Sequence, residues 1–222
     1  MTRIAIIGAH GKVGQQLMRL LYDRGDDFVG IVRSAEHAED VYRLGGHGSV
    51  IDIESATAEQ LAGAITGCEA VVFTAGAGAG SGVERKQSVD YGGSVLAAAA
   101  AQHAGIRRFI QVSAWGVDHP VAADADATWA AYVAAKRDAD AALARSTLDW
   151  TILRPGGLTA EDGTGRVMLA DAVERGSIPR EDVARLIIAS ILEPRSIGHT
   201  WEAVSGDTPI DQAVGALIAA KS

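Results

Sequence analysis

The sequence predicts an α/β fold in which a doubly wound, mostly parallel sheet carries helices on both faces. Short runs of apolar, β-branched residues alternate along the chain with longer stretches of helical pattern. The runs are almost continuously apolar, as expected for parallel strands that are covered on both faces. A glycine-rich turn also follows the first run directly, which is typical of this class.

Six strands and five helices are expected in the first two thirds of the chain. The strand candidates are Ile4–Ile7, Phe28–Val32, Val50–Ile53, Ala70–Phe73, Arg108–Val112 and Trp150–Leu153. The helix candidates lie near 12–24, 35–44, 57–65, 84–104 and 126–146.

The pattern changes after Pro155, where a glycine-rich loop precedes a short apolar segment at Val167–Leu169. A helix at 180–192, a strand at Thr200–Val204 and a helix near 209–219 are expected to follow. No linker, charge block or repeat divides the chain. We therefore expect one domain over 1–222, with 155–222 as a small substrate-side part.

Composition narrows the choice of partners. The 222 residues carry a net charge of −8, with a sequence pI near 5.2, and nothing suggests the basic face that nucleic acids or anionic membranes require. One cysteine, Cys68, excludes an internal disulfide and suits a reducing compartment. We expect a cytoplasmic protein that binds a small-molecule substrate, as a monomer or a homodimer.

The turn after the first strand has the spacing G-x-x-G-x-x-G. Gly8 permits a tight turn, Gly11 lets a pyrophosphate approach the backbone, and Gly14 allows close helix–strand packing. Because His10, Lys12 and Val13 complete the turn at a helix N-terminus, its amides would face the phosphates. The loop is too short for a P-loop, and Val13 replaces the hydroxyl that would bind magnesium. The pattern therefore predicts a Rossmann-type dinucleotide site.

The residues after the second strand indicate which nicotinamide cofactor fits. Arg33 and Ser34 stand where an NAD site usually has a carboxylate for the ribose hydroxyls. A guanidinium suits a 2′-phosphate, and Lys12 could add a second positive charge. NADP(H) is therefore expected in preference to NAD(H), the alternative being that Arg33 is only a solvated strand end.

Two further strand ends could border the cofactor. Asp52 and Ile53 end the third strand, where a carboxylate could reach the adenine amino group. Thr74, Ala75 and Gly76 follow the fourth, where small residues leave room for a ribose. Ordinary strand-end chemistry explains either set equally well.

Three residues form a candidate catalytic set. Tyr132 and Lys136 are four positions apart on an expected helix and so share a face. A phenol has an ordinary pKa near 10 and needs a neighbouring positive charge to act near neutrality. Ser113 closes the fifth strand, at the edge where open α/β sheets bind ligands, and its hydroxyl could polarise a substrate carbonyl.

With these residues in place, the chain resembles an atypical short-chain dehydrogenase/reductase with an NmrA-like NAD(P)-binding domain. The resemblance extends over nearly the whole chain. It is carried by Ile6–Gly14, Val89–Gly93, Gly105–Ala114, Tyr132–Asp140, Leu148–Leu158 and Ile178–Ala184.

The resemblance implies roles for matching positions. Tyr132 would be the acid/base, Lys136 would bind the nicotinamide ribose and lower the tyrosine pKa, and Ser113 would polarise the carbonyl. The backbone beside Pro155 would contact the carboxamide, and Arg180 and Asp182 would form a structural pair.

Two departures from the family pattern leave open whether the set is competent. Asp90 stands where extended members often have Asn, and Ser113 and Tyr132 are unusually spaced. Asp140 and Asp138 are expected on an exposed helix surface. The scattered histidines lack zinc-ligand spacing, so no metal is expected.

The sequence thus predicts an NADP(H)-dependent oxidoreductase that transfers hydride to or from a small carbonyl compound. Two alternatives stay open: a sugar epimerase or dehydratase that reuses the same residues, and a sensor that binds NADP without turnover.

Overall fold

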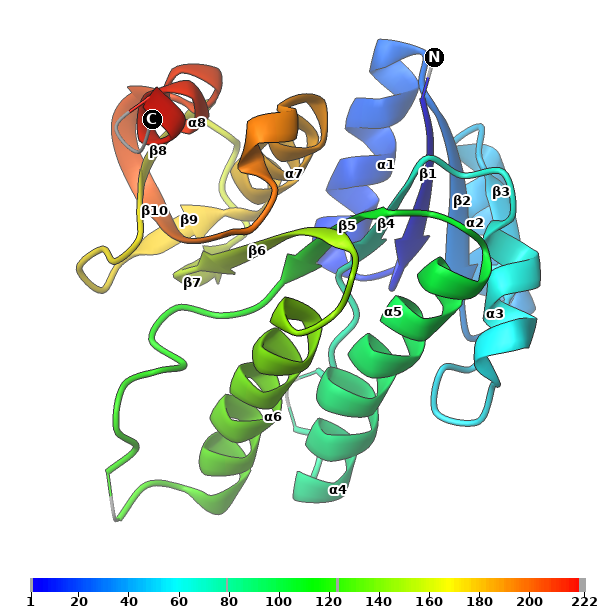
Figure 1. Ribbon diagram of the computed structural model, residues 1–222, viewed down its shortest axis with the longest axis horizontal. Helices are drawn as coiled ribbons and strands as arrows, with labels where there is room; N and C mark the ends of the chain where they lie inside the picture. Colours follow the sequence, from blue (N-terminus) through cyan, green and yellow to red (C-terminus); the bar gives the residue numbers. More distant parts are fainter. Residues whose placement is uncertain (1, 79, 123, 220–222) are drawn as a thin grey trace.

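A central sheet of eight strands organises the protein (Figure 1). The computed structural model describes residues 2–78, 80–122 and 124–219. In order across the sheet, the strands are β3 (His47–Val50), β2 (Asp27–Val32), β1 (Arg3–Ile7), β4 (Ala70–Phe73), β5 (Arg108–Val112), β6 (Asp149–Pro155), β10 (His199–Pro209) and β8 (Arg166–Ala170). All neighbours pair in parallel except β10 and β8. The expected doubly wound α/β fold is confirmed.

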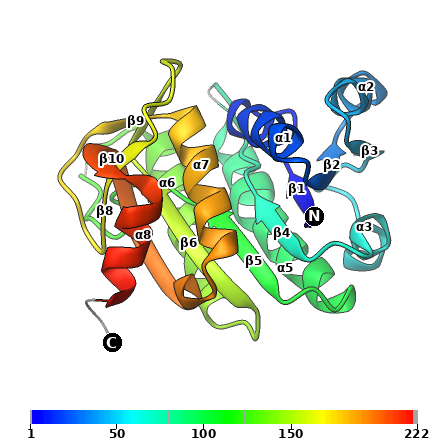
Figure 2. The same ribbon diagram turned by 90° about the horizontal axis from the view of Figure 1, so that it is seen from above.

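Two helical layers cover the sheet (Figure 2). One apolar core joins the sheet to α1 (Lys12–Arg24), α2 (Ala35–Arg43), α7 (Arg180–Leu192) and α8 (Ile210–Ala219). The other joins it to α3 (Ala58–Ile65), α5 (Gly93–His103) and α6 (Ala127–Ala144).

Strand β1 shows why the sequence forms two cores. Ile4 and Ile6 pack into the first core, while Ala5 and Ile7 pack into the second. Alternate side chains of a strand point to opposite faces, so only a continuously apolar run can fill both cores. Each of the three buried isoleucines contributes on the order of 1.5–3 kcal/mol.

Most expected elements are present, with two informative differences. The third strand is His47–Val50 and not Val50–Ile53, because the chain turns at Asp52, whose carbonyl accepts from the amides of Ser55 and Ala56. The expected helix at 84–104 consists of α4 (Val83–Arg85), the π-helix η1 (Lys86–Gly92) and α5.

The segment after β6 adds short elements that lacked a clear sequence signal. Strands β7 (Gly157–Thr159) and β9 (Ser177–Pro179) form a separate two-stranded pair, and a 3-10 helix, η2 (Pro194–Ser196), follows α7. None of the helices in the described ranges has the length and apolar character needed to cross a bilayer.

The strand order reverses between β1 and β4, which are neighbours although two strands separate them in the chain. At such a switch point the loops leaving the two strands diverge and open a crevice at the carboxyl edge of the sheet. The glycine turn leaves β1 at this point.

Candidate active site

A cavity of about 840 Å³ opens at the carboxyl edge of the strands. Its walls come from the glycine turn, the ends of β2, β4 and β5, the π-helix, α6 and the segment after β6. The lining residues are Gly8, His10, Gly11, Lys12, Val13, Ile31, Val32, Arg33, His37, Ile51, Ile53, Glu54, Thr74, Ala75, Gly76, Gly78, Arg85, Lys86, Val89, Asp90, Val112, Ser113, Asp126, Thr128, Trp129, Tyr132, Lys136, Leu158 and Arg180.

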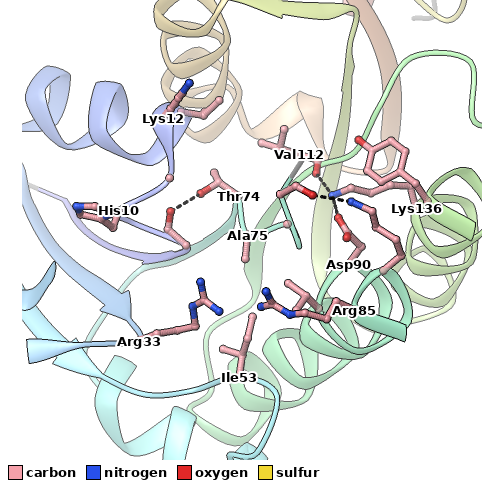
Figure 3. A pocket seen from close by; sticks show the side chains of 18 of the residues that line it. His10, Lys12, Arg33, Ile53, Thr74, Ala75, Arg85, Asp90, Val112 and Lys136 are labelled. Carbon is pink, nitrogen blue, oxygen red and sulfur yellow. Dashed lines mark hydrogen bonds and ion pairs between the residues drawn. The ribbon is translucent and has the colours of Figure 1, made fainter. Parts of the chain in front are cut away.

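The glycine turn forms one wall of the cavity, and its backbone packs so closely that two of its glycines leave no room for a side chain. Gly8 has φ +89°, and a Cβ there would lie 2.6 Å from the amide nitrogen of Ala75. Gly14 is buried, and a Cβ there would meet the carbonyl oxygen of Ala9 at 2.6 Å. Thr74 binds the two loops together by donating to the carbonyl oxygens of Ile7 and Gly8, at 3.2 and 3.3 Å (Figure 3).

The start of α1 has the features of an anion-binding helix N-terminus. Gly11 is the N-cap residue, no side chain caps the helix, and its first turn contains no acidic residue. The first amides of a helix lack partners within that helix and lie at the positive end of its dipole. Lys12 adds an exposed positive charge beside them.

Two arginines converge at one end of the cavity. Arg33 follows β2, Arg85 ends α4, and both line the cavity, with their guanidinium groups pointing toward one another in Figure 3. Glu54 binds Arg85 at 2.8 Å and accepts from Ser88 at 2.6 Å. These two contacts lower the pKa of Glu54. Arg33 has no hydrogen-bond or ion-pair partner among the described residues.

Two imidazoles border the same end. The rings of His10 and His37 are stacked, with centroids 3.5 Å apart, and His10 Nε2 lies 3.1 Å from a carboxylate oxygen of Asp40. This stack fixes His10 against α2 at the edge of the glycine turn.

At the other end, Ser113, Tyr132 and Lys136 all line the cavity. The Lys136 ammonium donates to the carbonyl oxygen of Val112 at 3.2 Å and lies 3.3 Å from a carboxylate oxygen of Asp90 (Figure 3). Both charged side chains are almost fully buried. The positive charge of Lys136 is therefore compensated before any ligand binds.

Tyr132 is correspondingly in its protonated form. Burial, followed by the negative charges of Asp90 and Asp140, raises its pKa to about 12. The Lys86 ammonium lies 5.3 Å from the centroid of the phenol ring and donates to the carbonyl oxygen of Gly78 at 2.8 Å. Without a cofactor, the phenol is thus a proton donor and not a base near neutral pH.

Ser113 belongs to a buried polar network centred on Asp140. The carboxylate of Asp140 accepts from Ser113 Oγ at 2.8 Å, from Gln111 Nε2 at 2.7 Å and from Arg154 Nε at 2.9 Å. Burial raises the pKa of Asp140, against the effect of these donors. The expectation that Asp140 lies on an exposed surface is wrong, whereas Asp138 is exposed.

The expected cofactor residues fall into two groups. Gly8, His10, Gly11, Lys12, Val13, Arg33, Ile53, Thr74, Ala75, Gly76 and Lys136 line the cavity, whereas Gly14, Ser34, Asp52 and Pro155 do not. Ser34 caps α2 by accepting from the His37 amide, and Asp52 accepts from the Glu54 amide in its own turn. Pro155 is buried, and its carbonyl oxygen accepts from the Trp115 amide.

Arg180 and Asp182 do not form the expected structural pair. Asp182 is fully buried and holds the loop before β8, accepting from the amides of Thr164 and Gly165. Arg180 instead lines the cavity. Only Asp182 has the anticipated structural role, because the two side chains leave the start of α7 in different directions.

Four residues in or beside the site were not predicted from the sequence as site residues: Lys86, Arg85, Asp140 and Trp129. Asp140 follows Lys136 by four positions, as Lys136 follows Tyr132, so helical periodicity already placed all three on one face. Lys86 and Arg85 reach the cavity through the π-helix and the turn before it, and π-helices often occur at functional sites. That irregularity has no sequence signature in this chain.

Three features together are typical of a dinucleotide-binding protein. They are the uncapped start of α1, the cavity at the switch point of the sheet, and the glycines of the turn that leave no room for a side chain. The chain belongs to the NAD(P)H-binding family, whose model matches residues 8–194.

Relatives of known sequence or structure agree with this assignment. The chain is 38% identical to the uncharacterized sugar epimerase YhfK of Bacillus subtilis (strain 168), over 97% of this chain and 100% of that protein. It is similar to the solved structure of a Bacillus halodurans protein assigned to the NAD-dependent epimerases/dehydratases, with a TM-score of 0.89, 34% identity and coverage of 98% and 100%. It also resembles the oxidoreductase ylbE of Lactococcus lactis, with a TM-score of 0.85, 28% identity and coverage of 98% and 97%.

Proposed function

We propose that the protein is an NADP(H)-dependent oxidoreductase of the atypical short-chain dehydrogenase/reductase type, with an NmrA-like domain, acting on a small carbonyl compound. The observation that carries the proposal is the shared cavity. One continuous cavity joins the glycine turn and Arg33 at one end to Ser113, Tyr132 and Lys136 at the other. A nicotinamide dinucleotide bound in this cavity would have its phosphates at the glycine turn and its nicotinamide near Ser113, Tyr132 and Lys136.

The residues that would hold the cofactor follow from their positions. The start of α1 and Lys12 would bind the pyrophosphate, and Ile53 would border the adenine. Arg33 has no hydrogen-bond or ion-pair partner among the described residues, although its charge helps to lower the pKa of Glu54, and it would pair with a 2′-phosphate, a group that guanidinium binds well. Arg85, which lines the same cavity and points toward Arg33 in Figure 3, would strengthen the preference for NADP(H).

In the reductive direction, Tyr132 would act as the proton donor. When bound, the cofactor supplies a hydride to the carbonyl carbon. As the carbonyl oxygen gains negative charge, the Tyr132 hydroxyl would donate its proton to that oxygen. Because the pKa of Tyr132 is about 12, the phenol carries this proton throughout the physiological range.

Lys136 and Ser113 would act as positioning residues in this scheme. Lys136 is fixed between Val112 and Asp90, from which it could reach a ribose hydroxyl. The Ser113 hydroxyl donates its hydrogen bond to Asp140. In this orientation only a lone pair of the hydroxyl faces the cavity, and the hydroxyl would have to rotate to donate to a substrate. We therefore assign the larger share of carbonyl activation to Tyr132.

Net consumption of NADPH tests this proposal. With a panel of small aldehydes and ketones, a reductase oxidises NADPH in proportion to the alcohol formed. A sugar epimerase, the function named for the Bacillus subtilis relative, would interconvert nucleotide sugars with no net loss of NADPH. Isomer formation without NADPH loss would overturn the proposed reduction.

A second candidate, a non-catalytic NADP sensor, is favoured by one observation. Ser113 and Lys136 are both engaged by buried carboxylates, an arrangement that a binding protein tolerates as well as an enzyme. Tight NADPH binding without turnover of any carbonyl in the panel would support the sensor.

A further inference from the structure

Arg180 is a positively charged residue of the cavity that the proposed cofactor site does not use. It is the first residue of α7, is partly buried and lines the cavity. Among the residues that the structure describes, its guanidinium has no hydrogen-bond or ion-pair partner. The two adjacent carboxylates are both engaged: Glu181 by Arg185 at 2.5 Å, and Asp182 by Thr164.

The position of Arg180 is fixed by its surroundings. β9 ends at Pro179, which pairs with Thr159 of β7, and Leu158 of the same strand lines the cavity. The buried Asp182 anchors the first turn of α7 to the loop before β8. Arg180 therefore projects from a rigid support in the segment after β6, which lies outside the strand–helix units that carry the proposed cofactor site.

Other charged side chains in or beside the cavity are already paired. Asp90 pairs with Lys136, and Asp140 pairs with Arg154. Lys86 donates to the Gly78 carbonyl. Asp126, which also lines the cavity, accepts from the Trp129 amide at the start of α6.

The guanidinium could in principle bind the cofactor pyrophosphate, since α7 packs beside α1. That anion, however, already has the uncapped start of α1 and Lys12. Arg180, which shares the cavity with Tyr132 and Leu158, is thus left without a counter-charge from the protein or the cofactor, so its partner would be a group of the substrate.

We propose that Arg180 binds a carboxylate of the substrate, so that the substrate class is a carbonyl compound that carries a carboxylate. Guanidinium binds carboxylate through two parallel hydrogen bonds, which would orient the carbonyl relative to Tyr132. Trp129 and Leu158 offer apolar surface for the body of such a molecule. This inference rests on the proposed function, because it assumes that the reacting carbonyl lies beside Tyr132.

Calorimetry with a matched pair of probes tests the inference without requiring turnover. Protein saturated with NADP⁺ is titrated with benzoate and with benzamide, which have the same ring but differ in charge. The titrations are repeated with Arg180→Gln and with the control Arg175→Gln, which removes an exposed arginine outside the cavity. An Arg180→Lys variant keeps the charge but loses the two-pronged geometry.

We expect the wild-type protein and Arg175→Gln to prefer benzoate by about tenfold or more, as a charge-assisted contact of about 1.4 kcal/mol would give. Arg180→Gln should lose that preference and retain wild-type NADP⁺ affinity and thermal stability, and Arg180→Lys should be intermediate.

Three results would overturn the inference. They are the absence of a benzoate preference in the wild-type protein, an unchanged preference in Arg180→Gln, or a loss of NADP⁺ affinity in Arg180→Gln, which would assign the guanidinium to the pyrophosphate. Failure of the wild-type protein to bind NADP⁺ would instead contradict the proposed function itself.

Discussion

The ammonium of Lys136 lies 3.3 Å from the carboxylate of Asp90, and the two side chains are 7% and 1% exposed. A lysine expected to lower the pKa of Tyr132 is thus neutralised by a partner 46 positions earlier in the chain. The same carboxylate contributes to the raised pKa of Tyr132. The pair connects the π-helix to α6 and determines the protonation state in which Tyr132 meets a ligand.

Replacing Asp90 should move the pH dependence of reduction. Reduction needs the protonated phenol, so the wild-type rate should fall only as pH rises through the Tyr132 pKa of about 12. Asp90→Asn removes one negative charge that raises this pKa, so the decline should begin at lower pH. The NADPH-dependent rate is measured as a function of pH, with the exposed Asp138→Asn on α6 as control.

The same substitution should also weaken the fold. Removing one member of a buried ion pair leaves the other uncompensated and typically costs about 3–5 kcal/mol. Chemical denaturation of Asp90→Asn and Asp138→Asn measures this difference. Equal unfolding free energies and equal pH profiles would show that the Asp90–Lys136 pair has neither effect.

Tyr132→Phe should abolish most turnover and leave cofactor binding intact. A positioned proton donor contributes about 10²- to 10⁴-fold to the rate, and the substitution removes only the hydroxyl. Steady-state rates with NADPH and a carbonyl compound that the wild-type protein reduces, together with NADPH affinity from calorimetry, separate the two effects. Unchanged turnover would exclude Tyr132 as the proton donor.

Ser113→Ala should cost less than Tyr132→Phe. The Ser113 hydroxyl donates to Asp140 at 2.8 Å, so its removal mainly deletes one buried hydrogen bond, worth about 1 kcal/mol. We expect a rate loss of about tenfold or less in the same assay. A loss as large as that of Tyr132→Phe would indicate that the hydroxyl turns toward the substrate.

Gly8→Ala should destabilise the protein, whereas Gly63→Ala should not. A Cβ at Gly8 would lie 2.6 Å from the Ala75 backbone at φ +89°, and strained backbone of this kind costs on the order of 1–3 kcal/mol. Gly63 lies in α3 with no atom near its Cβ position, so alanine there should stabilise the helix by up to about 1 kcal/mol. Thermal unfolding compares the two variants, and equal midpoints would contradict the packing described for the glycine turn.

The sequence predicted the parts of the fold that repeat a local pattern. β4 is continuously apolar, and β1 and β5 are largely so, because each of these strands is buried on both faces. The edge strand β3 was predicted a few residues too late, at Val50–Ile53 in place of His47–Val50, because His47 and Val50 are exposed and the strand has no apolar run of its own.

The site was predictable to the extent that its residues occupy standard positions of the fold. The glycine turn, Arg33, Ser113, Tyr132 and Lys136 all follow from strand ends and helical spacing. The contacts that neutralise Lys136 and Asp140 were not predictable. Asp90 reaches Lys136 only through a π-helix, and the partners of Asp140 come from β5, β6 and the residue that follows β5. Such contacts depend on how helices rotate against the sheet, which local patterns do not encode.

Arg33→Ala should selectively weaken binding of NADPH. A guanidinium that pairs with the 2′-phosphate contributes nothing to NADH, so the ratio of the two affinities should fall by about tenfold while NADH affinity stays constant. Arg19→Ala, which removes an exposed arginine of α1 outside the cavity, serves as control. An unchanged ratio in Arg33→Ala would remove Arg33 from the cofactor site.

Parallel calorimetric titration of the ligand-free protein with NADPH and NADH shows whether this cavity binds NADP(H). We expect one site per chain with at least a tenfold preference for NADPH, equivalent to about 1.4 kcal/mol. Equal affinity for the two would contradict the role of Arg33, and binding of neither would contradict the proposed function.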